Sequence, residues 1–307
     1  MPIDPAGLTG DWWDKLVVSL ELADLSDDDT RARLDSAAAK ANNQGVQTAA
    51  AWRYGRALPM LTAAVEIWTR LEHVPGVIGA RTSRGAVYRK IGDFDAARDD
   101  HEMALALAED YGLLNPAITA RIHLGAVLAE VGEPDEAESL LRDALEDSEQ
   151  VGDNWGAGHA QRFLGHVYEG RKTWGVAYDA YAAAAERWAA VQAPAERIEA
   201  AAGMARSALA RGYSFDAYGL GEQVLDHLGR HGPARLDEPL RVYWTLYRIL
   251  HISQQPENAR DVLRMAYAMM VQQMDGLSPE QRVMFRENVA VNRDLAATWA
   301  AVSAEDE

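Results

Sequence analysis

Small and apolar residues recur at equal intervals along most of this chain. The pattern is clearest in the stretch 162–184, where the recurring positions are Leu164, Gly165, Tyr168, Ala177, Tyr181 and Ala184. Forty residues earlier, the corresponding positions are Leu124, Gly125, Leu128, Ala137, Leu141 and Ala144. Another forty residues earlier, they are Gly85, Tyr88, Ala97, His101 and Ala104. Repetition at a fixed interval predicts an array of stacked units rather than a globule with one core.

Each unit has the spacing of two helices joined by a tight turn. The first Gly of a unit falls where the two helices cross closely, because a side chain there would push them apart. Gly92, Gly132 and Gly212 fall between the two helices, where the turn favours positive φ. Six units follow one another between residues 38 and 276, and the last is longer by two residues. The pattern predicts an all-α array of about six helical hairpins.

The N-terminal residues 1–37 depart from the repeat and predict capping helices. Two helical stretches follow one another here, and the second should begin near Asp27. Trp12 and Trp13 lie on the first stretch. They either cover the open end of the array or form an exposed pair that binds a partner or a second copy of the chain.

The C-terminal residues 277–307 also depart from the repeat. Ser278 and Gln281 have the spacing of a capping box, and Pro279 stands at the first helical position. These signals predict one helix from 279 to about 302 that closes the last hairpin. The final residues form a short acidic end.

Charge and composition argue against several classes of function and site. The 307 residues include 47 acidic and 30 basic side chains, which gives a formal net charge of −17. An acidic chain is a poor binder of nucleic acid or of an anionic membrane, because both attract basic surfaces. Cysteine is absent, so disulfides and thiolate metal sites are excluded. No apolar run approaches the length of a membrane span, and we expect a cytoplasmic protein.

The recurring positions from Leu164 to Ala184, with their close copy from Leu124 to Ala144, resemble the tetratricopeptide repeat signature. The 40-residue unit is similar to the longer variant found in bacterial regulators of the MalT-like kind. The resemblance covers residues 38–276. It implies a right-handed superhelix, or α-solenoid, whose first helices line a concave groove. Arg84 and His101 depart from the signature, because apolar residues are usual at both places.

The resemblance also implies which residues face the groove. The candidate binding residues are Arg89, His159, Arg162, His166, Arg206, Trp244 and Arg248. Arginine and histidine gathered in an acidic protein suggest a site for an acidic peptide or a carboxylate-bearing ligand, with Arg162 and Arg206 as anchors. The alternative is that these residues pair within the chain, for example Arg162 with Glu199 or Glu169.

Catalytic and metal sites find little support in the sequence. Signatures of nucleophile elbows, phosphate-binding loops and dinucleotide sites are absent. His159, His166 and Glu169 could share a helix face, but no second cluster completes a metal site. We therefore expect no catalytic residue, no metal and no cofactor.

The leading hypothesis is a non-enzymatic adaptor or regulator that binds a peptide segment of a partner protein. The alternatives are a regulator that senses a small effector, and a scaffold that self-associates through Trp12, Trp13 or the C-terminal helix.

Overall fold

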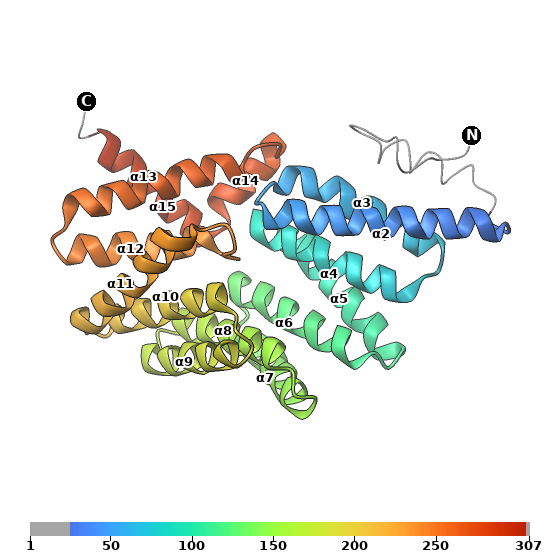
Figure 1. Ribbon diagram of the computed structural model, residues 1–307, viewed down its shortest axis with the longest axis horizontal. Coiled ribbons are helices and arrows are strands. Elements are labelled where there is room, and N and C mark those ends of the chain that lie inside the picture. Colours follow the sequence, from blue (N-terminus) through green and yellow to red (C-terminus); the bar gives the residue numbers. More distant parts are fainter. Residues whose placement is uncertain (1–24, 305–307) are drawn as a thin grey trace.

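The computed structural model describes residues 25–304, and helices form most of this part of the chain (Figure 1). Residues 25–304 contain fourteen helices and no strand. The helices are α2 (Asp28–Ala50), α3 (Tyr54–Arg70), α4 (Val74–Ile91), α5 (Phe94–Asp110), α6 (Leu114–Val131), α7 (Pro134–Gln150), α8 (Asn154–Gly170), α9 (Trp174–Ala190), α10 (Pro194–Ala210), α11 (Ser214–His231), α12 (Pro239–Ile252), α13 (Pro256–Gln273), α14 (Pro279–Glu287) and α15 (Ala290–Ala304). The all-α fold class predicted from the repeat is confirmed.

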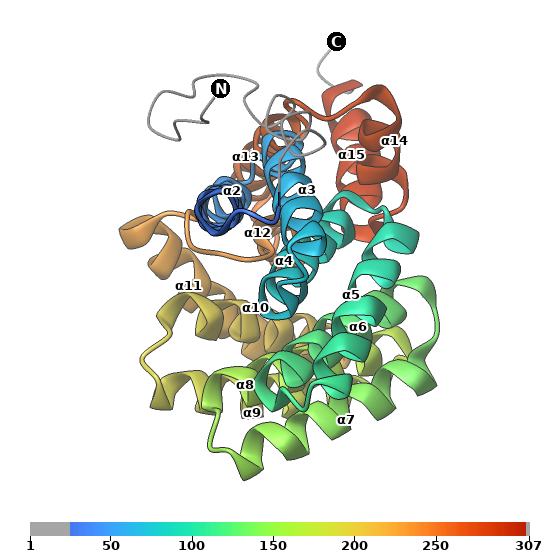
Figure 2. The same cartoon turned by 90° about the vertical axis from the view of Figure 1, so that its right-hand side faces the viewer.

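The helices pair in chain order, α2 with α3 and so on to α12 with α13. The six hairpins stack side by side in a curved array, and α14 and α15 lie at its C-terminal end (Figures 1 and 2). First helices of neighbouring hairpins, such as α4, α6 and α8, also contact each other. The number of hairpins therefore agrees with the number of units counted in the sequence.

The recurring glycines have equivalent surroundings in successive hairpins. A Cβ atom at Gly85 would lie 2.7 Å from His101, and one at Gly125 would lie 2.7 Å from Leu141. A Cβ atom at Gly165 would lie 2.6 Å from Tyr181. In each case the neighbour is the residue sixteen positions later, on the second helix of the same hairpin. Glycine at this place lets the two helices approach closely, as the spacing predicts.

The turns repeat as regularly as the helices. A residue with positive φ occurs at every twentieth position from 52 to 232. Glycine fills the predicted places 92, 132 and 212. Other side chains stand at equivalent places, and they are Trp52, Glu72, Lys172 and Gln192. The next such residues, at 254 and 276, are out of step by two and then four, which locates the lengthening of the last unit.

The two ends of the array differ in detail from the predicted caps. Helix α2 runs without a break through residue 38, where we expected the array to begin. Trp12 and Trp13 lie outside the described residues. None of the helices within 25–304 is both long and apolar enough to cross a membrane.

The single C-terminal helix predicted from 279 to about 302 is wrong. The capping box at Ser278 is present, but α14 ends at Glu287 and α15 begins at Ala290. The amide of Asn292 donates to the carbonyl of Phe285 at 2.8 Å. The amide of Asn288 donates to the carbonyl of Gly92, also at 2.8 Å. The break therefore lets polar side chains bind freed or distant carbonyl groups.

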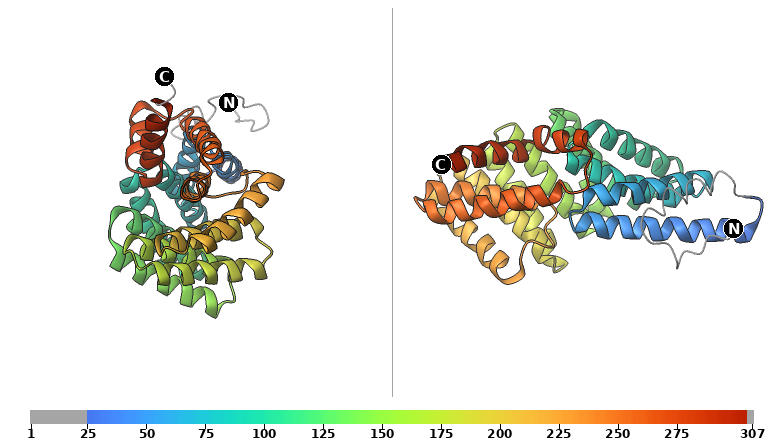
Figure 3. Two further views of the ribbon diagram at one scale, coloured as in Figure 1. Left: turned by 90° about the vertical axis from the view of Figure 1, so that its left-hand side faces the viewer. Right: turned by 90° about the horizontal axis from the view of Figure 1, so that it is seen from above.

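The curvature of the array brings its first and last hairpins into contact (Figure 3). Gly55 at the start of α3 lies directly against the backbone of Gly276, so closely that a side chain could not fit between them. The rings of Tyr54 and Phe285 lie 6.5 Å apart. One hydrophobic cluster contains buried residues of α3, α4 and α12 to α15. The array is thus closed rather than open.

Candidate functional site

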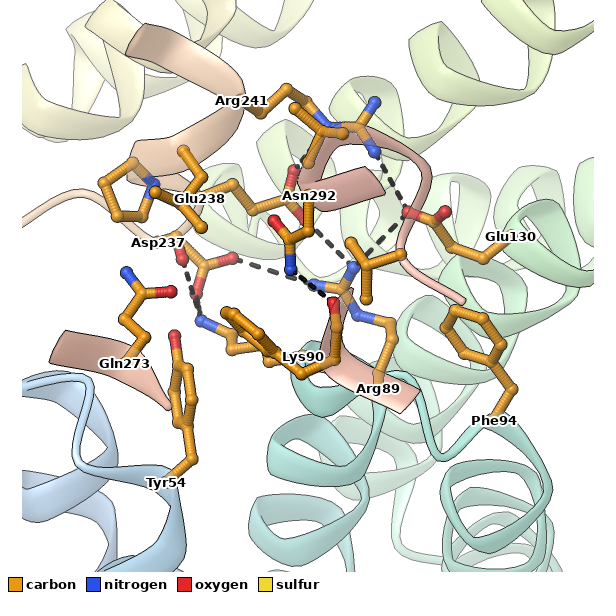
Figure 4. A pocket seen from close by; sticks show the side chains of 15 residues that line it. Tyr54, Arg89, Lys90, Phe94, Glu130, Asp237, Glu238, Arg241, Gln273 and Asn292 are labelled. Atoms are coloured by element: carbon orange, nitrogen blue, oxygen red, sulfur yellow. Dashed lines mark hydrogen bonds and ion pairs between the residues drawn. The ribbon is translucent and has the colours of Figure 1, made fainter. Parts of the chain in front are cut away.

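Four first helices, α4, α6, α8 and α10, share one face of the array, which we call the inner face. It is defined by the charged residues Arg89, Lys90, Glu130, Arg162, Glu169, Glu199 and Arg206, each of which contacts another charged side chain there. The connection between α11 and α12 reaches this face and places residues 236–238, the acidic segment, against it (Figure 4). The site is therefore built from residues far apart in the chain.

Arg162 lies at the centre of this arrangement and is 2% exposed. Its Nη1 lies 2.6 Å from Oε2 of Glu199, and its Nη2 lies 2.9 Å from Oδ2 of Asp237. The other oxygen of Glu199 accepts a hydrogen bond of 2.6 Å from the backbone N–H of Glu238. Arg162 thus pairs with Glu199 within the chain, which is the alternative given above from the sequence. Asp237 is a second partner.

Arg89 and Lys90, at the end of α4, bind the acidic segment from the other side. Arg89 Nη1 donates to Oε1 of Glu238 at 2.9 Å. Lys90 Nζ donates to the backbone carbonyl of Asp237 at 3.0 Å and also pairs with its carboxylate. The second oxygen of Glu238 lies 3.1 Å from Nε of Arg241. Both carboxylates of the segment are held by more than one cation (Figure 4).

Arg206 has a different set of partners. Its Nε lies 2.9 Å from Glu169. Its other nitrogens donate to the hydroxyl groups of Thr245 at 3.0 Å and Tyr181 at 3.3 Å. Arg241 links this group to the rest, since it lies 3.0 Å from Glu130 as well as near Glu238. Arg206 is buried and its polar atoms are satisfied by the chain itself.

The pairs described above form one connected network, whose members lie between residues 89 and 241. Its cations are Arg89, Lys90, Arg162, Arg206 and Arg241, and its anions are Glu130, Glu169, Glu199, Asp237 and Glu238. Five basic side chains thus face five acidic ones, and burial raises the pKa of one of the acids, Glu199, to about 7. Burial makes such pairing necessary, because an unpaired charge in a protein interior is strongly destabilising.

The network shifts the pKa values of its carboxyl groups. Burial acts to raise the pKa of Asp237, but Lys90, Arg162 and Arg89 hold it well below the usual range. Burial has the same effect on Glu238, and Arg89 and Arg241 hold its pKa well below the usual range. Both carboxyl groups of the acidic segment are therefore ionised at neutral pH.

The two histidines predicted to face the groove are packing residues. His159 lies between the rings of Trp155 and Trp188, with both centroids 5.2 Å away. His166 lies between Phe163 at 5.4 Å and Tyr181 at 5.9 Å. Burial, then the charge of Arg162, lowers the pKa of His159 to about 3. Burial and Arg241 lower the pKa of His166 well below its ordinary value, so both rings are neutral at pH 7.

The other predicted residues lie apart from the ion network. Trp244 stacks on Tyr247 with ring centroids 5.2 Å apart. It is partly buried against the hydrophobic cluster that joins α3 and α4 to α12–α15. Arg248 is exposed. In the described part of the chain, no three His, Asp or Glu residues are placed to hold a metal ion.

Sequence reasoning missed Asp237, Glu238 and Arg241. The available signal was the lengthening of the last unit, which occurs at an acidic pair followed by Pro239. A period of 40 residues cannot say where an insertion points, because it describes only contacts between adjacent units. The carboxylates that complete the site come from the one connection that breaks the period.

A small cavity of about 50 Å³ lies beside the acidic segment, towards the C-terminal helices. Its walls include Tyr54, Lys90, Glu130, Gln273 and Asn292 (Figure 4). A cavity of this size has room for a few water molecules. Sites for metabolites or cofactors are several times larger.

One part of the sequence matches a known protein family. A family model of the tetratricopeptide repeat matches residues 118–151, which hold most of α6 and all of α7. The matched hairpin is therefore similar to a tetratricopeptide repeat. No curated protein matches the sequence.

Several solved structures share the fold over most of the chain. A Rap protein complexed with Competence and Sporulation Factor is similar with a TM-score of 0.61 and 14% identity, over 97% of this chain and 89% of that chain. The Rap conjugation gene regulator of plasmid pLS20, in complex with the Phr* peptide, is similar with a TM-score of 0.61 and 13% identity, over 96% and 79%. BtubC from P. vanneervenii is similar with a TM-score of 0.55 and 16% identity, over 74% and 94%. At these identities the likeness concerns the fold alone.

Proposed function

We propose that this chain is a non-enzymatic adaptor or regulator that binds a peptide segment of a partner protein on its inner face. One observation carries the proposal: the inner face and its surroundings hold main-chain atoms of an acidic segment. Lys90 donates to the carbonyl of Asp237, and Glu199 accepts from the N–H of Glu238. The indole of Trp52 donates to the carbonyl of Leu236 at 3.3 Å. Side chains that bind backbone groups in this way can hold an extended peptide.

The structural likenesses support the same function. Two of the similar Rap proteins were solved with Competence and Sporulation Factor and with the Phr* peptide. Those ligands belong to those proteins, and here they support the class of function rather than a particular partner. A cytoplasmic location and a lack of nucleic-acid binding stay predictions from the sequence, the second from its acidic charge.

The two alternative functions have less support. A small effector would need a larger space than the cavity of about 50 Å³ beside the acidic segment. Self-association through the C-terminal helix would compete with contacts inside the chain, since Trp299 of α15 stacks on Tyr267 at 5.1 Å. A role of Trp12 and Trp13 in self-association stays a prediction.

Affinity capture with the full chain, followed by cross-linking and mass spectrometry, tests the proposal. We expect a captured protein whose cross-linked segment maps to the inner face. Lys90→Ala should reduce capture at least fivefold, because Lys90 binds both the backbone and the carboxylate of a held segment. Arg230→Ala, on the exposed surface of α11, is the matched control and should leave capture unchanged. Equal capture by both variants would contradict the site.

A further inference from the structure

The connection that carries the acidic segment is longer than its counterparts. Between α11 and α12 there are seven residues, 232–238. Each of the four preceding connections between hairpins has three, and these are 71–73, 111–113, 151–153 and 191–193. A three-residue turn suffices to join two hairpins in this array. The additional residues therefore serve something other than the turn, and they end on the inner face.

The acidic segment is held as a bound peptide would be held. Leu236 is buried in the same hydrophobic cluster as Tyr54 and Leu240. The next two residues present their carboxylates to the cations of three helices, α4, α8 and α12. The last three residues of the connection are thus held by the array, whereas Ala234 and Arg235 just before them are exposed.

The charges of the inner face limit how the segment can leave. Arg89 and Arg162 are 5% and 2% exposed, and they would be left without these carboxylates if the segment simply moved away. Glu199 and Glu130 would stay beside them, but the five cations of the network would then face only three acidic side chains, and excess buried charge is strongly unfavourable. An incoming pair of carboxylates would restore the same pairs, so exchange avoids this cost. The geometry favours replacement of the segment over its spontaneous release.

We propose that residues 236–238 are an internal ligand, and that the partner presents an apolar residue followed by two adjacent carboxylates that replace them. The inference rests on the proposed function and names the chemistry of the peptide. A tethered competitor acts at a high effective concentration and weakens the apparent affinity for any outside peptide. The segment therefore keeps the inner face closed to weak acidic ligands and open to a matching one.

Fluorescence anisotropy with a labelled peptide of residues 232–240, GPARLDEPL, tests this proposal. The double variant Asp237→Asn/Glu238→Gln keeps the shape of the internal segment and removes its charge. We expect it to bind the peptide at least tenfold more tightly than the wild-type chain. The control variant Glu222→Gln/Asp226→Asn removes two charges from the exposed face of α11 and should bind like wild type. A peptide with Asn and Gln in place of its carboxylates should not bind.

The outcomes separate this inference from the proposed function. Equal binding by the wild type and the double variant would overturn the internal ligand and leave peptide binding intact. No binding by a folded double variant, with an unchanged circular dichroism spectrum, would also overturn it. Partner capture by the full chain, as described above, would still decide the proposed function independently.

A second measurement keeps the native carboxylates, in case the double variant does not fold. The chain has no cysteine, so Arg235→Cys provides a unique position for a fluorescent label beside the segment. Addition of unlabelled GPARLDEPL up to millimolar concentration should lower the anisotropy of the label as the segment is released. The peptide lacking carboxylates should leave it unchanged. A constant signal with both peptides would overturn the proposal.

Discussion

His101 occupies a position of the second hairpin at which its neighbours are apolar. The equivalent residues are Leu61 and Leu141, and all three side chains are fully buried. The ring of His101 stacks on His123 at 5.2 Å, and its nitrogens have no hydrogen-bond partner among the described residues. Burial, then the neighbouring His123, lowers the pKa of His101 well below its usual value. A neutral, unsatisfied ring therefore stands in a hydrophobic layer.

We expect His101→Leu to raise the free energy of unfolding by about 1–2 kcal/mol at pH 7, because it removes a buried unsatisfied polar group. The folded ring resists protonation whereas the unfolded one binds a proton below about pH 6.5. The wild-type stability should therefore fall as the pH decreases from 7 to 5. The variant should lose less, as measured by thermal unfolding at both values. His231→Leu on the exposed end of α11 is the control, and equal losses in all three proteins would contradict the assignment.

Lys172 stands at a turn position where the equivalent residues of the adjacent hairpins are Gly132 and Gly212. Its φ is 59°, a region in which side chains other than glycine are strained. The side chain is exposed. We expect Lys172→Gly to stabilise the protein by about 0.5–1 kcal/mol, since relief of strain exceeds the added entropy of the unfolded chain. Lys172→Ala should give no such gain in chemical denaturation, and a gain equal to that of glycine would refute the argument.

At the scale of the helix, close packing within each hairpin explains why the fold was predictable from the sequence. The contact made by Gly125 and Leu141 is local, at a separation of sixteen positions, and a Gly makes the same contact in each of the first four hairpins. Equal spacing therefore records helix identity, helix pairing and turn position together. Turns that lack glycine, such as the one at Lys172, can be located from the period alone, because they lie forty residues from turns that contain glycine.

We expect Gly125→Ala to lower the free energy of unfolding by about 1–3 kcal/mol, because the added methyl group would overlap the buried Leu141. Gly219→Ala on α11 is the matched substitution, since nothing lies within 4 Å of its added Cβ. It should stabilise the protein by up to about 1 kcal/mol through helix propensity. Urea titration of both variants measures the difference, and the same sign for both would contradict the packing argument.

The sequence could not predict the elements that depend on distant contacts. The break between α14 and α15 is stabilised by Asn288, whose partner Gly92 is 196 residues away. The ionic partners of Arg162 include Asp237, at a separation of 75 residues. Neither pairing repeats, so neither leaves a period in the chain. Arg89, Arg162 and Arg206 could be assigned to one face from the sequence, because they lie at repeated positions of the first helices, whereas Arg241 beside the irregular connection was missed.

At the scale of the whole molecule, the contact between the first and last hairpins is the feature that shapes the site. It places the acidic segment between α4 and α12 and brings α14 beside the end of α4. Without this contact, the inner face would lose Glu238 as a partner of Arg89. Closure of the array and pairing of the buried charges therefore support each other.

Asn288→Ala removes a hydrogen bond that joins the C-terminal helices to Gly92. We expect the free energy of unfolding to fall by about 1 kcal/mol. Amide hydrogen exchange should become faster in α14, α15 and the end of α4. Asn258→Ala removes an exposed side-chain hydrogen bond to Gln255 and serves as the control. Faster exchange confined to α14, with α4 unchanged, would mean that the link does not couple the two ends.

The backbone contact of Gly55 with Gly276 has a consequence for how the molecule comes apart. In an open solenoid each terminal repeat has one neighbour, and unfolding can spread inward from a frayed tip, like a zipper. Here the outermost hairpins act as neighbours of each other, so the stack has no loose end at that junction. Heating or denaturant should therefore unfold the whole array in a single cooperative transition.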